Sequence, residues 1–288
     1  VNAAAGHVLD YEPMSSPSTH AVSPVLPGVL ALAEARGCSG RDIVVACAKG
    51  FETQHRLLHA ATQGKRSERH FHPPGEVGVM GAAVAAGHLL GLNAERLRNA
   101  LGIADSRAGA ITANAGTMTK CTHTGNAAAS GLDAALLAAR GFTASPDVLD
   151  APAGYVAAFF NAGPFDYDRL MQFGRPFRIV DPGMAYKFFP SKYPTQFAIT
   201  AALALAKSAR SRVVVAACCT AFTAAEIVYR NAANALNAEP RAVYAALEGG
   251  SGPDAAFIEL IRRDEERRRS LGRRPRVEIV GLGGQWQN

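Results

Sequence analysis

The sequence has little of what marks secreted, membrane-spanning or metal-binding proteins. Only 7% of its 288 residues are aromatic. No window offers the roughly 18 consecutive apolar residues that a transmembrane helix requires. Residues 1–7 contain no lysine or arginine, so they lack the cationic start of a signal peptide. We therefore expect a soluble, cytoplasmic protein without a membrane partner.

Cysteine is also scarce and scattered. The five cysteines are Cys38, Cys47, Cys121, Cys218 and Cys219. None of them forms a C-x-x-C pair, so the sequence predicts neither a zinc site of cysteines nor a disulfide framework. Reduced thiols of a cytosolic protein are the expected state.

A histidine metal site is the other possibility that the sequence raises. His70 and His72 form an H-x-H pair, which together with His20 or His123 would supply imidazole ligands. Two prolines follow the pair at once, and no acidic partner for it is obvious in the sequence. We therefore predict no metal and no cofactor.

Positive charge is unevenly distributed. The formal net charge is +6, and residues 262–276 alone contain eight arginines against three acidic residues. Such a run can bind nucleic acid, but solvated tails share this composition. We expect a divergent, basic C-terminal tail and do not expect nucleic acid as a partner.

Helical signals dominate the first 150 residues. Apolar residues recur at helical spacing in 22–36, 75–90, 94–104 and 126–140, and a capping box at 39–42 begins a helix that runs to about His59. Gly37, Gly91 and Gly141 each end a helix, and a polar residue two positions later caps the next element. This recurrence is typical of antiparallel helical hairpins.

The pattern changes after Ala151. Residues 155–163 favour a short helix, 177–180 a strand and 196–207 one more helix, while 213–215 and 276–280 favour short strands. We predict a mainly α fold, with an all-α helical-hairpin domain over 1–175. A partial α+β region is predicted for 176–288.

The unusual residues concentrate in 71–131, which is rich in glycine and alanine. His72 stands between Phe71 and two prolines that lead into a helix, and Lys120 stands in a small-residue loop before the helix predicted from Asn126. The N-terminus of a helix attracts carboxylates and phosphates, and a lysine held among small residues can bind an anion. His20 ends a Ser/Pro loop. For each of these residues, a surface or capping role is the alternative interpretation.

Several motifs, in this order, resemble the MmgE/PrpD family. This family contains 2-methylcitrate dehydratase, cis-aconitate decarboxylase and iminodisuccinate epimerase. The motifs are His7-Val8-Leu9-Asp10-Tyr11, Thr19-His20, Arg69-His70-Phe71-His72-Pro73-Pro74, Gly116-Thr117-Met118-Thr119-Lys120-Cys121-Thr122-His123-Thr124-Gly125-Asn126-Ala127-Ala128 and Lys187-Phe188-Phe189-Pro190. The resemblance covers about residues 1–207.

The resemblance implies a large all-α domain with a smaller α+β lid, a cofactor-free active site and a homodimer. It carries the family's pocket residues onto Asp10, His20, His72, Lys120 and Lys187. Lysines would bind the carboxylates of a small di- or tricarboxylate, His20 or His72 would move a proton, and Asp10 would orient an imidazole or bind a hydroxyl. We add His123 and Lys192 as candidates for substrate binding.

The resemblance has departures that keep a second interpretation open. Glu12-Pro13-Met14 stands where the family has Asp-Thr, and Ser191-Lys192-Tyr193 where it commonly has a histidine. The family's first helices and its Lys-Phe-Ser segment have no match here. We predict a cofactor-independent lyase of the dehydratase type, with 2-methylcitrate as an example of its substrate. The alternatives are a decarboxylase or epimerase of a related acid, and a truncated, non-catalytic homologue that binds carboxylates or only dimerises.

Overall fold

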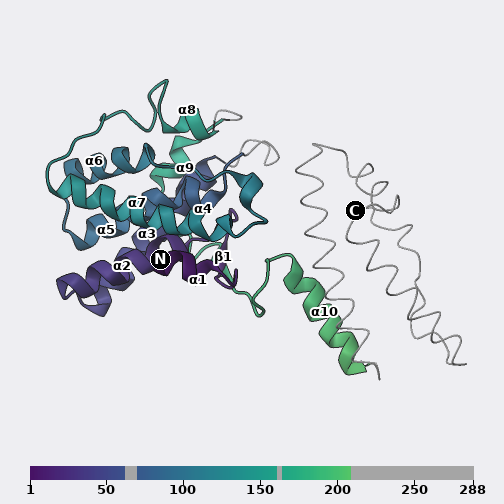
Figure 1. Ribbon diagram of the computed structural model, residues 1–288. Helices are drawn as coiled ribbons and strands as arrows, with labels where there is room; N and C mark the ends of the chain where they lie inside the picture. Colours follow the sequence, from purple (N-terminus) through teal and green to yellow (C-terminus); the bar gives the residue numbers. More distant parts are fainter. Residues whose placement is uncertain (62–69, 161–163, 209–288) are drawn as a thin grey trace, which may run out of the picture. The chain divides into compact units, whose positions relative to one another are not determined.

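The computed structural model describes residues 1–61, 70–160 and 164–208. They belong to two compact units, Val1–Tyr193 and Pro194–Asn288. In the first unit, the elements are α1 (Asn2–His7), β1 (Met14–Ser15), α2 (Val22–Arg36), α3 (Gly40–Ala60), α4 (Pro73–Glu76), α5 (Gly78–Leu89), α6 (Ala94–Asp105), a 3-10 turn (Thr112–Asn114), α7 (Thr119–Ala139), α8 (Tyr155–Phe160), α9 (Tyr167–Met171) and β2 (Met184–Ala185). The mainly α prediction is confirmed (Figure 1).

Local chemistry sets the helix ends, much as the sequence predicts. Gly37 and Gly91 adopt left-handed backbone angles, with φ of 65° and 64°; Gly37 directly follows α2, and Gly91 is the second residue after α5. The Ser39 side chain accepts from the backbone of Asp42, whose carboxylate accepts in return, so the capping box of α3 is complete. Asn93 caps α6 in the same way through the Arg96 N–H.

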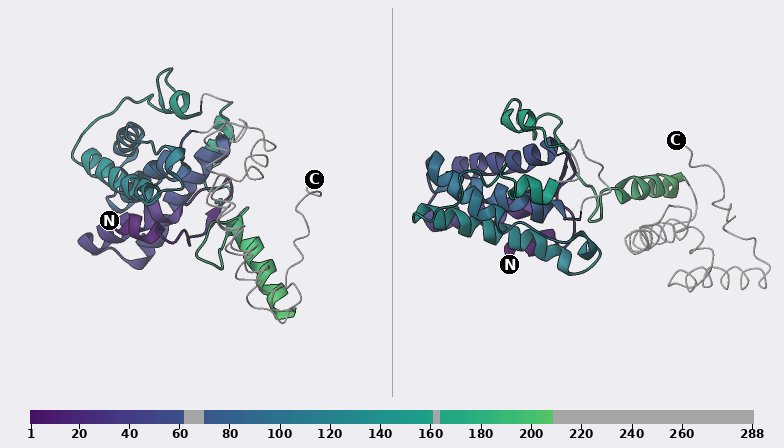
Figure 2. Two further views of the ribbon diagram at one scale, coloured as in Figure 1. Left: turned by 45° about the vertical axis from the view of Figure 1, so that its right-hand side comes forward. Right: turned by 90° about the horizontal axis from the view of Figure 1, so that it is seen from above.

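Helix α5 is the centre of this unit. Every residue from Gly78 to Leu89 except His88 is buried, which is typical of a helix enclosed on all sides. Helices α2, α3, α6 and α7 pack against it. Figure 2 shows the purple and blue helices of the N-terminal part and the teal helix α7 as one bundle. Small residues in α5 allow these neighbours to approach closely.

One crossing depends on paired glycines. A Cβ atom added to Gly81 in α5 would lie 2.6 Å from the carbonyl oxygen of Gly50 in α3 and 2.7 Å from Gln54 Cγ. A Cβ atom added to Gly50 would in turn lie 2.7 Å from the carbonyl oxygen of Gly81. The two backbones therefore touch directly at this point.

The start of α7 differs from the prediction. The sequence predicts a loop at Lys120 and a helix from Asn126, but α7 already begins at Thr119. Threonines and Gly125 lower the helix propensity here. Packing compensates, since α1 lies against this turn: Thr124 donates from Oγ1 to the Ala3 carbonyl at 3.3 Å. Lys120 therefore stands on the first turn of a helix.

The strand prediction for 177–180 is wrong, because these residues form turns. Their segment is held by side chains rather than by strand pairing: Glu52 accepts from the backbone N–H groups of Gly174 and Arg178 at 2.9 and 2.7 Å. The strands are instead β1 and β2, which pair antiparallel with Met14 opposite Ala185. β1 lies in a segment whose prolines and serines predict a loop.

The second unit contributes helix α10 (Thr195–Ser208) to the described residues, which confirms the helix predicted for 196–207. The strands predicted at 213–215 and 276–280, and the basic tail, lie outside the described residues. The predicted domain boundary after residue 175 stays a prediction. Among the described helices, none combines the length and the apolar character that crossing a membrane requires.

The Gly50–Gly81 contact predicts that Gly81→Ala destabilises the protein. The added methyl group has no room between two helix backbones, and such overpacking costs about 1–3 kcal/mol of the free energy of unfolding. Gly6→Ala in α1 is the matched control, since its Cβ would meet nothing within 4 Å. Chemical denaturation should rank Gly81→Ala below the native chain and Gly6→Ala at or above it. Equal stability of the two variants would contradict the close contact.

Candidate functional site

The carboxylate of Asp10 is the meeting point of three basic side chains. His20 Nε2 lies 3.2 Å from Asp10 Oδ1, Lys187 Nζ lies 3.1 Å from the same oxygen, and Lys120 Nζ lies 3.2 Å from Asp10 Oδ2. Lys187 Nζ also donates to the backbone carbonyl of Asp10. Segments far apart in the sequence thus converge on one side chain.

Two packing arrangements produce this convergence. Helix α1, which leads into Asp10, packs on α7, which carries Lys120 and His123 on its first turns. The β1–β2 pair then brings Lys187, two residues after β2, to the segment between α1 and β1. Asp10 itself has a φ of 50°, in a region of backbone angles that aspartate tolerates better than most residues.

Four buried histidines lie beside Asp10. The rings of His7 and His20 meet edge to face with centroids 4.5 Å apart, and the His20 and His72 centroids are 6.1 Å apart. His72 Nδ1 lies 3.1 Å from His123 Nδ1, so one of these nitrogens donates and the other accepts. His72 is the residue that precedes α4, and its backbone N–H donates to the Ala110 carbonyl. The imidazoles form a continuous group.

Glu12 lies behind these rings, buried. Its Oε1 is 2.6 Å from His7 Nδ1 and 3.4 Å from His20 Nδ1. It also accepts from the Ser23 hydroxyl at 2.5 Å and from the Ser23 N–H at 2.7 Å, at the first turn of α2. These partners outweigh its burial and hold the pKa of Glu12 well below its usual range.

The formal charges of the group balance when its imidazoles are neutral. Lys120 and Lys187 are offset by Asp10 and Glu12. A net positive charge therefore requires a protonated histidine. The sequence predicts a cationic site from its lysines and histidines, and the structure adds Glu12 as a counter-charge.

The surroundings shift the proton affinities in different directions. Burial opposes the charge of Asp10, but His20, Lys120 and Lys187 outweigh it and lower the pKa. Burial and the positive charge of Lys120 lower the pKa of His72 to about 2. Burial also lowers the pKa of His20, but there Glu12 and Asp10 oppose the change. The carboxylates thus raise the proton affinity of His20, whereas the lysine lowers the proton affinity of His72.

Six of the seven site residues predicted from sequence come together in this group: Asp10, His20, His72, Lys120, His123 and Lys187. Lys192 is partly buried and lies five residues after Lys187. Its role stays a prediction. The members that sequence analysis missed are Glu12 and His7. An acidic residue two positions after Asp10, in a segment of otherwise small and apolar residues, was the available signal for Glu12.

A metal-type donor set exists within the group. His7, Glu12 and His20 each offer one ligand atom, and these atoms lie within 4.8 Å of one another. Two imidazoles and a carboxylate are a donor set that zinc accepts. Here, however, Glu12 is already engaged by Ser23 and His7. His70 of the H-x-H pair is exposed, whereas His72 is buried.

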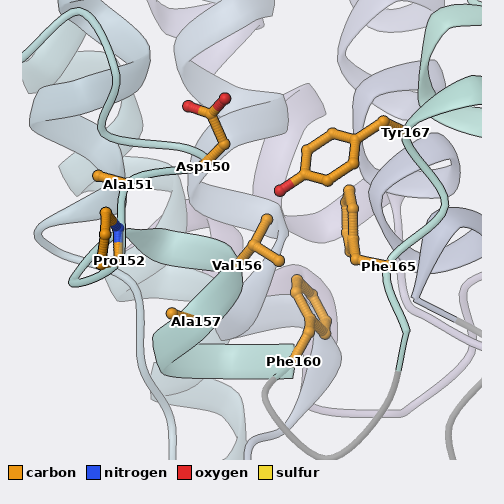
Figure 3. A pocket seen from close by; sticks show the side chains of 8 residues that line it. All are labelled: Asp150, Ala151, Pro152, Val156, Ala157, Phe160, Phe165 and Tyr167. Atoms are coloured by element: carbon orange, nitrogen blue, oxygen red, sulfur yellow. The ribbon is translucent and has the colours of Figure 1, made fainter.

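A separate hollow of about 300 Å³ lies by α8 and α9 (Figure 3). Most of its lining residues are apolar or aromatic, but polar atoms make up the larger part of its exposed wall, and the Asp150 carboxylate and the Tyr167 hydroxyl are among its polar groups. The lining residues are Asp150, Ala151, Pro152, Val156, Ala157, Phe160, Phe165 and Tyr167. None of them is a cation, so this hollow is unsuited to a multiply charged anion.

The Asp10 contacts predict that Asp10→Asn destabilises the protein at neutral pH. The Lys187 side chain is fully buried, and breaking such a pair costs about 3 kcal/mol of the free energy of unfolding. Because the pKa of Asp10 is lowered by folding, its contribution is present above the ordinary carboxylate range and is lost as pH falls through the lowered pKa. The stability difference from the native chain should therefore shrink in acid.

Asp133→Asn is the matched control, since Asp133 pairs with Arg107 at the surface and its side chain is 54% exposed. Breaking an exposed pair of this kind costs about 1 kcal/mol or less. Denaturant unfolding between pH 7 and pH 3 measures both variants. Equal losses for the two, or a loss for Asp10→Asn that stays constant with pH, would contradict the proposed position of Asp10.

Comparison with known proteins identifies relatives of this chain. The MmgE/PrpD N-terminal domain model matches residues 1–168. Human cis-aconitate decarboxylase is 39% identical over 211 residues, which are 72% of this chain and 44% of the human protein. The mouse cis-aconitate decarboxylase is 38% identical over 72% of this chain and 43% of its own length. That of Aspergillus terreus is 35% identical over 150 residues, 50% of this chain and 31% of its own.

The chain thus spans less than half the length of these curated relatives. The family match includes the elements that carry Asp10, His20, His72 and Lys120, and Lys187 follows it. The resemblance seen in the sequence motifs is confirmed: this chain belongs to the MmgE/PrpD family.

Proposed function

We propose that this chain carries the catalytic groups of a cofactor-independent lyase that acts on a small di- or tricarboxylate, with cis-aconitate as the first candidate. The observation that supports this most is the convergence of two lysines and His20 on the Asp10 carboxylate, with His72 beside them. The names of the relatives favour decarboxylation over the dehydration of 2-methylcitrate. A cytoplasmic homodimer remains our prediction.

Substrate binding would use the solvent-facing side of the group. The side chains of Asp10 and Lys120 are 19% and 20% exposed, whereas Lys187 and the histidines lie behind them. A substrate carboxylate can therefore share the Lys120 ammonium with Asp10 without opening the protein. Lys187 lies close enough to Asp10 to add a second positive charge to the same region.

Decarboxylation requires little more than charge stabilisation and a proton. The bond between a substrate carbon and one carboxylate breaks, and that carboxylate leaves as CO₂. The electron pair remains on carbon and is delocalised into the conjugated double bond and a neighbouring carboxylate. The lysines stabilise the enolate-like charge that develops there. An imidazole then donates a proton to carbon, and it regains one from water after the product leaves.

Other reactions of the family use the same groups in another order. In dehydration or epimerisation, an imidazole first removes the proton beside a carboxylate, and a proton donor then assists loss of hydroxide or returns the proton on the other face. A second class of function is carboxylate binding without catalysis. Such binding needs only the cationic side of the group, Lys120 and Lys187.

The proposal predicts CO₂ release from cis-aconitate by the purified chain. Carbonate trapping measures the gas, and ultraviolet absorbance follows the conjugated double bond. Formation of an unsaturated acid from 2-methylcitrate without CO₂ would instead indicate a dehydratase. Tight binding of these acids with no chemical change would indicate the non-catalytic homologue and would overturn the lyase proposal.

His72→Gln should lower kcat by about 100-fold or more, since positioned acid–base groups contribute at least that much. The matched control is His88→Gln. His88 is a partly buried histidine that also has a lysine neighbour, with its Nδ1 3.1 Å from Lys49 Nζ, but it lies at the end of α5 outside the group. Unchanged turnover in His72→Gln, with both variants folded, would remove His72 from the chemistry.

A further inference from the structure

The ring of His20 lies between two carboxylates. Its Nε2 is 3.2 Å from Asp10 Oδ1, and its Nδ1 is 3.4 Å from Glu12 Oε1. Among the described residues, His20 Nδ1 has no hydrogen-bond partner, so Glu12 acts on the ring through its negative charge. The protonated ring carries an N–H on both sides. Its two acidic neighbours therefore favour the protonated form of His20.

Several polar contacts hold the Glu12 carboxylate in place. Both of its oxygens accept hydrogen bonds from Ser23, and His7 Nδ1 lies 2.6 Å from Oε1. Ser23 belongs to the first turn of the 15-residue helix α2, whose positive end favours an ionised carboxylate. Helix α2 thus holds a negative charge at a set position behind His20.

His72 has the opposite surroundings. Its Nδ1 faces His123, its ring lies beside His20, and the positive charge of Lys120 opposes its protonation. Among the described residues, no carboxylate contacts it. Positive neighbours favour the neutral imidazole. The two rings, 6.1 Å apart, therefore differ in which protonation state their neighbours stabilise.

We propose that Glu12 is a positioning residue whose fixed negative charge keeps the exchangeable proton of the histidine group on His20, leaving His72 neutral. The charged and titratable groups that face His20 are His7 from α1, Asp10 and Glu12 from the following segment, and His72 before α4. Lys120 and Lys187 act on it through Asp10.

The catalytic roles that this inference gives to His20 and His72 rest on the proposed function. Within that function, His20 is the proton donor, and His72 is the neutral partner that accepts a proton or orients the substrate. When His20 takes up a proton, the otherwise balanced group gains a positive charge that compensates a bound polycarboxylate. Separating acid and base by opposite surroundings is a general solution for sites that need both at one pH.

The test is the pH titration of the histidine ring signals by NMR in the native chain, Glu12→Gln and Ser23→Ala. His20→Gln and His72→Gln identify the signals. His20 should titrate at higher pH than His72 in the native chain. Glu12→Gln should lower the His20 midpoint by about one pH unit or more, because an opposite charge at this distance is lost. Ser23→Ala keeps the Glu12 charge, so the midpoint should stay.

A purely structural role of Glu12 predicts another result: both variants lose stability and neither moves the His20 midpoint. That result, or a His72 that titrates above His20, would overturn the inference. If Glu12→Gln does not fold, Glu12→Asp serves instead, since it withdraws the charge by one methylene and should move the midpoint in the same direction by less.

Activity gives a separate readout. If the chain turns over, the alkaline limb of its kcat/KM profile, which reports groups of the free enzyme, should follow deprotonation of His20 and move to lower pH in Glu12→Gln by the NMR shift. The titration itself needs no substrate. A shifted midpoint in a chain without turnover would therefore reject the proposed function and retain the role of Glu12.

Discussion

The contact of Asp10 with three basic side chains is the interaction on which the site depends. The Lys187 side chain is fully buried and pairs with Asp10, so the carboxylate makes that burial possible. His20 contacts the same oxygen, Oδ1, and Lys120 contacts the other oxygen, Oδ2. Helix α1 on α7 and the β1–β2 pair are the structural means that bring these groups within reach.

Charge balance gives this arrangement a functional consequence. Two lysines facing two carboxylates are stable without a ligand, which a cluster of unpaired cations would not be. Binding of a polycarboxylate then adds negative charge to a balanced group. Protonation of an imidazole in the site compensates this added charge. Substrate binding and the supply of the catalytic proton are therefore one process in this account.

The sequence predicts the helix ends of the bundle and most of the site. Gly37, Gly91 and the Ser39 capping box act through residues close to them in the sequence, so a local pattern is enough to predict them. The early start of α7 and the loss of the predicted strand at 177–180 depend on contacts with α1 and Glu52, which no local pattern contains. The sequence did not predict Glu12 as a site residue for the same reason, since its contacts with His20 and Ser23 form only in the folded chain.

Proton uptake on ligand binding tests the central claim most directly. Calorimetric titration of the chain with a non-reactive saturated tricarboxylate, in buffers of different ionisation enthalpy, measures the number of protons bound per ligand. The account predicts a net uptake above neutral pH, where the unliganded group is balanced and His20 gains its proton with the ligand. Tight binding whose heat is independent of the buffer would contradict it, because the ligand would then have met a site that was already positively charged.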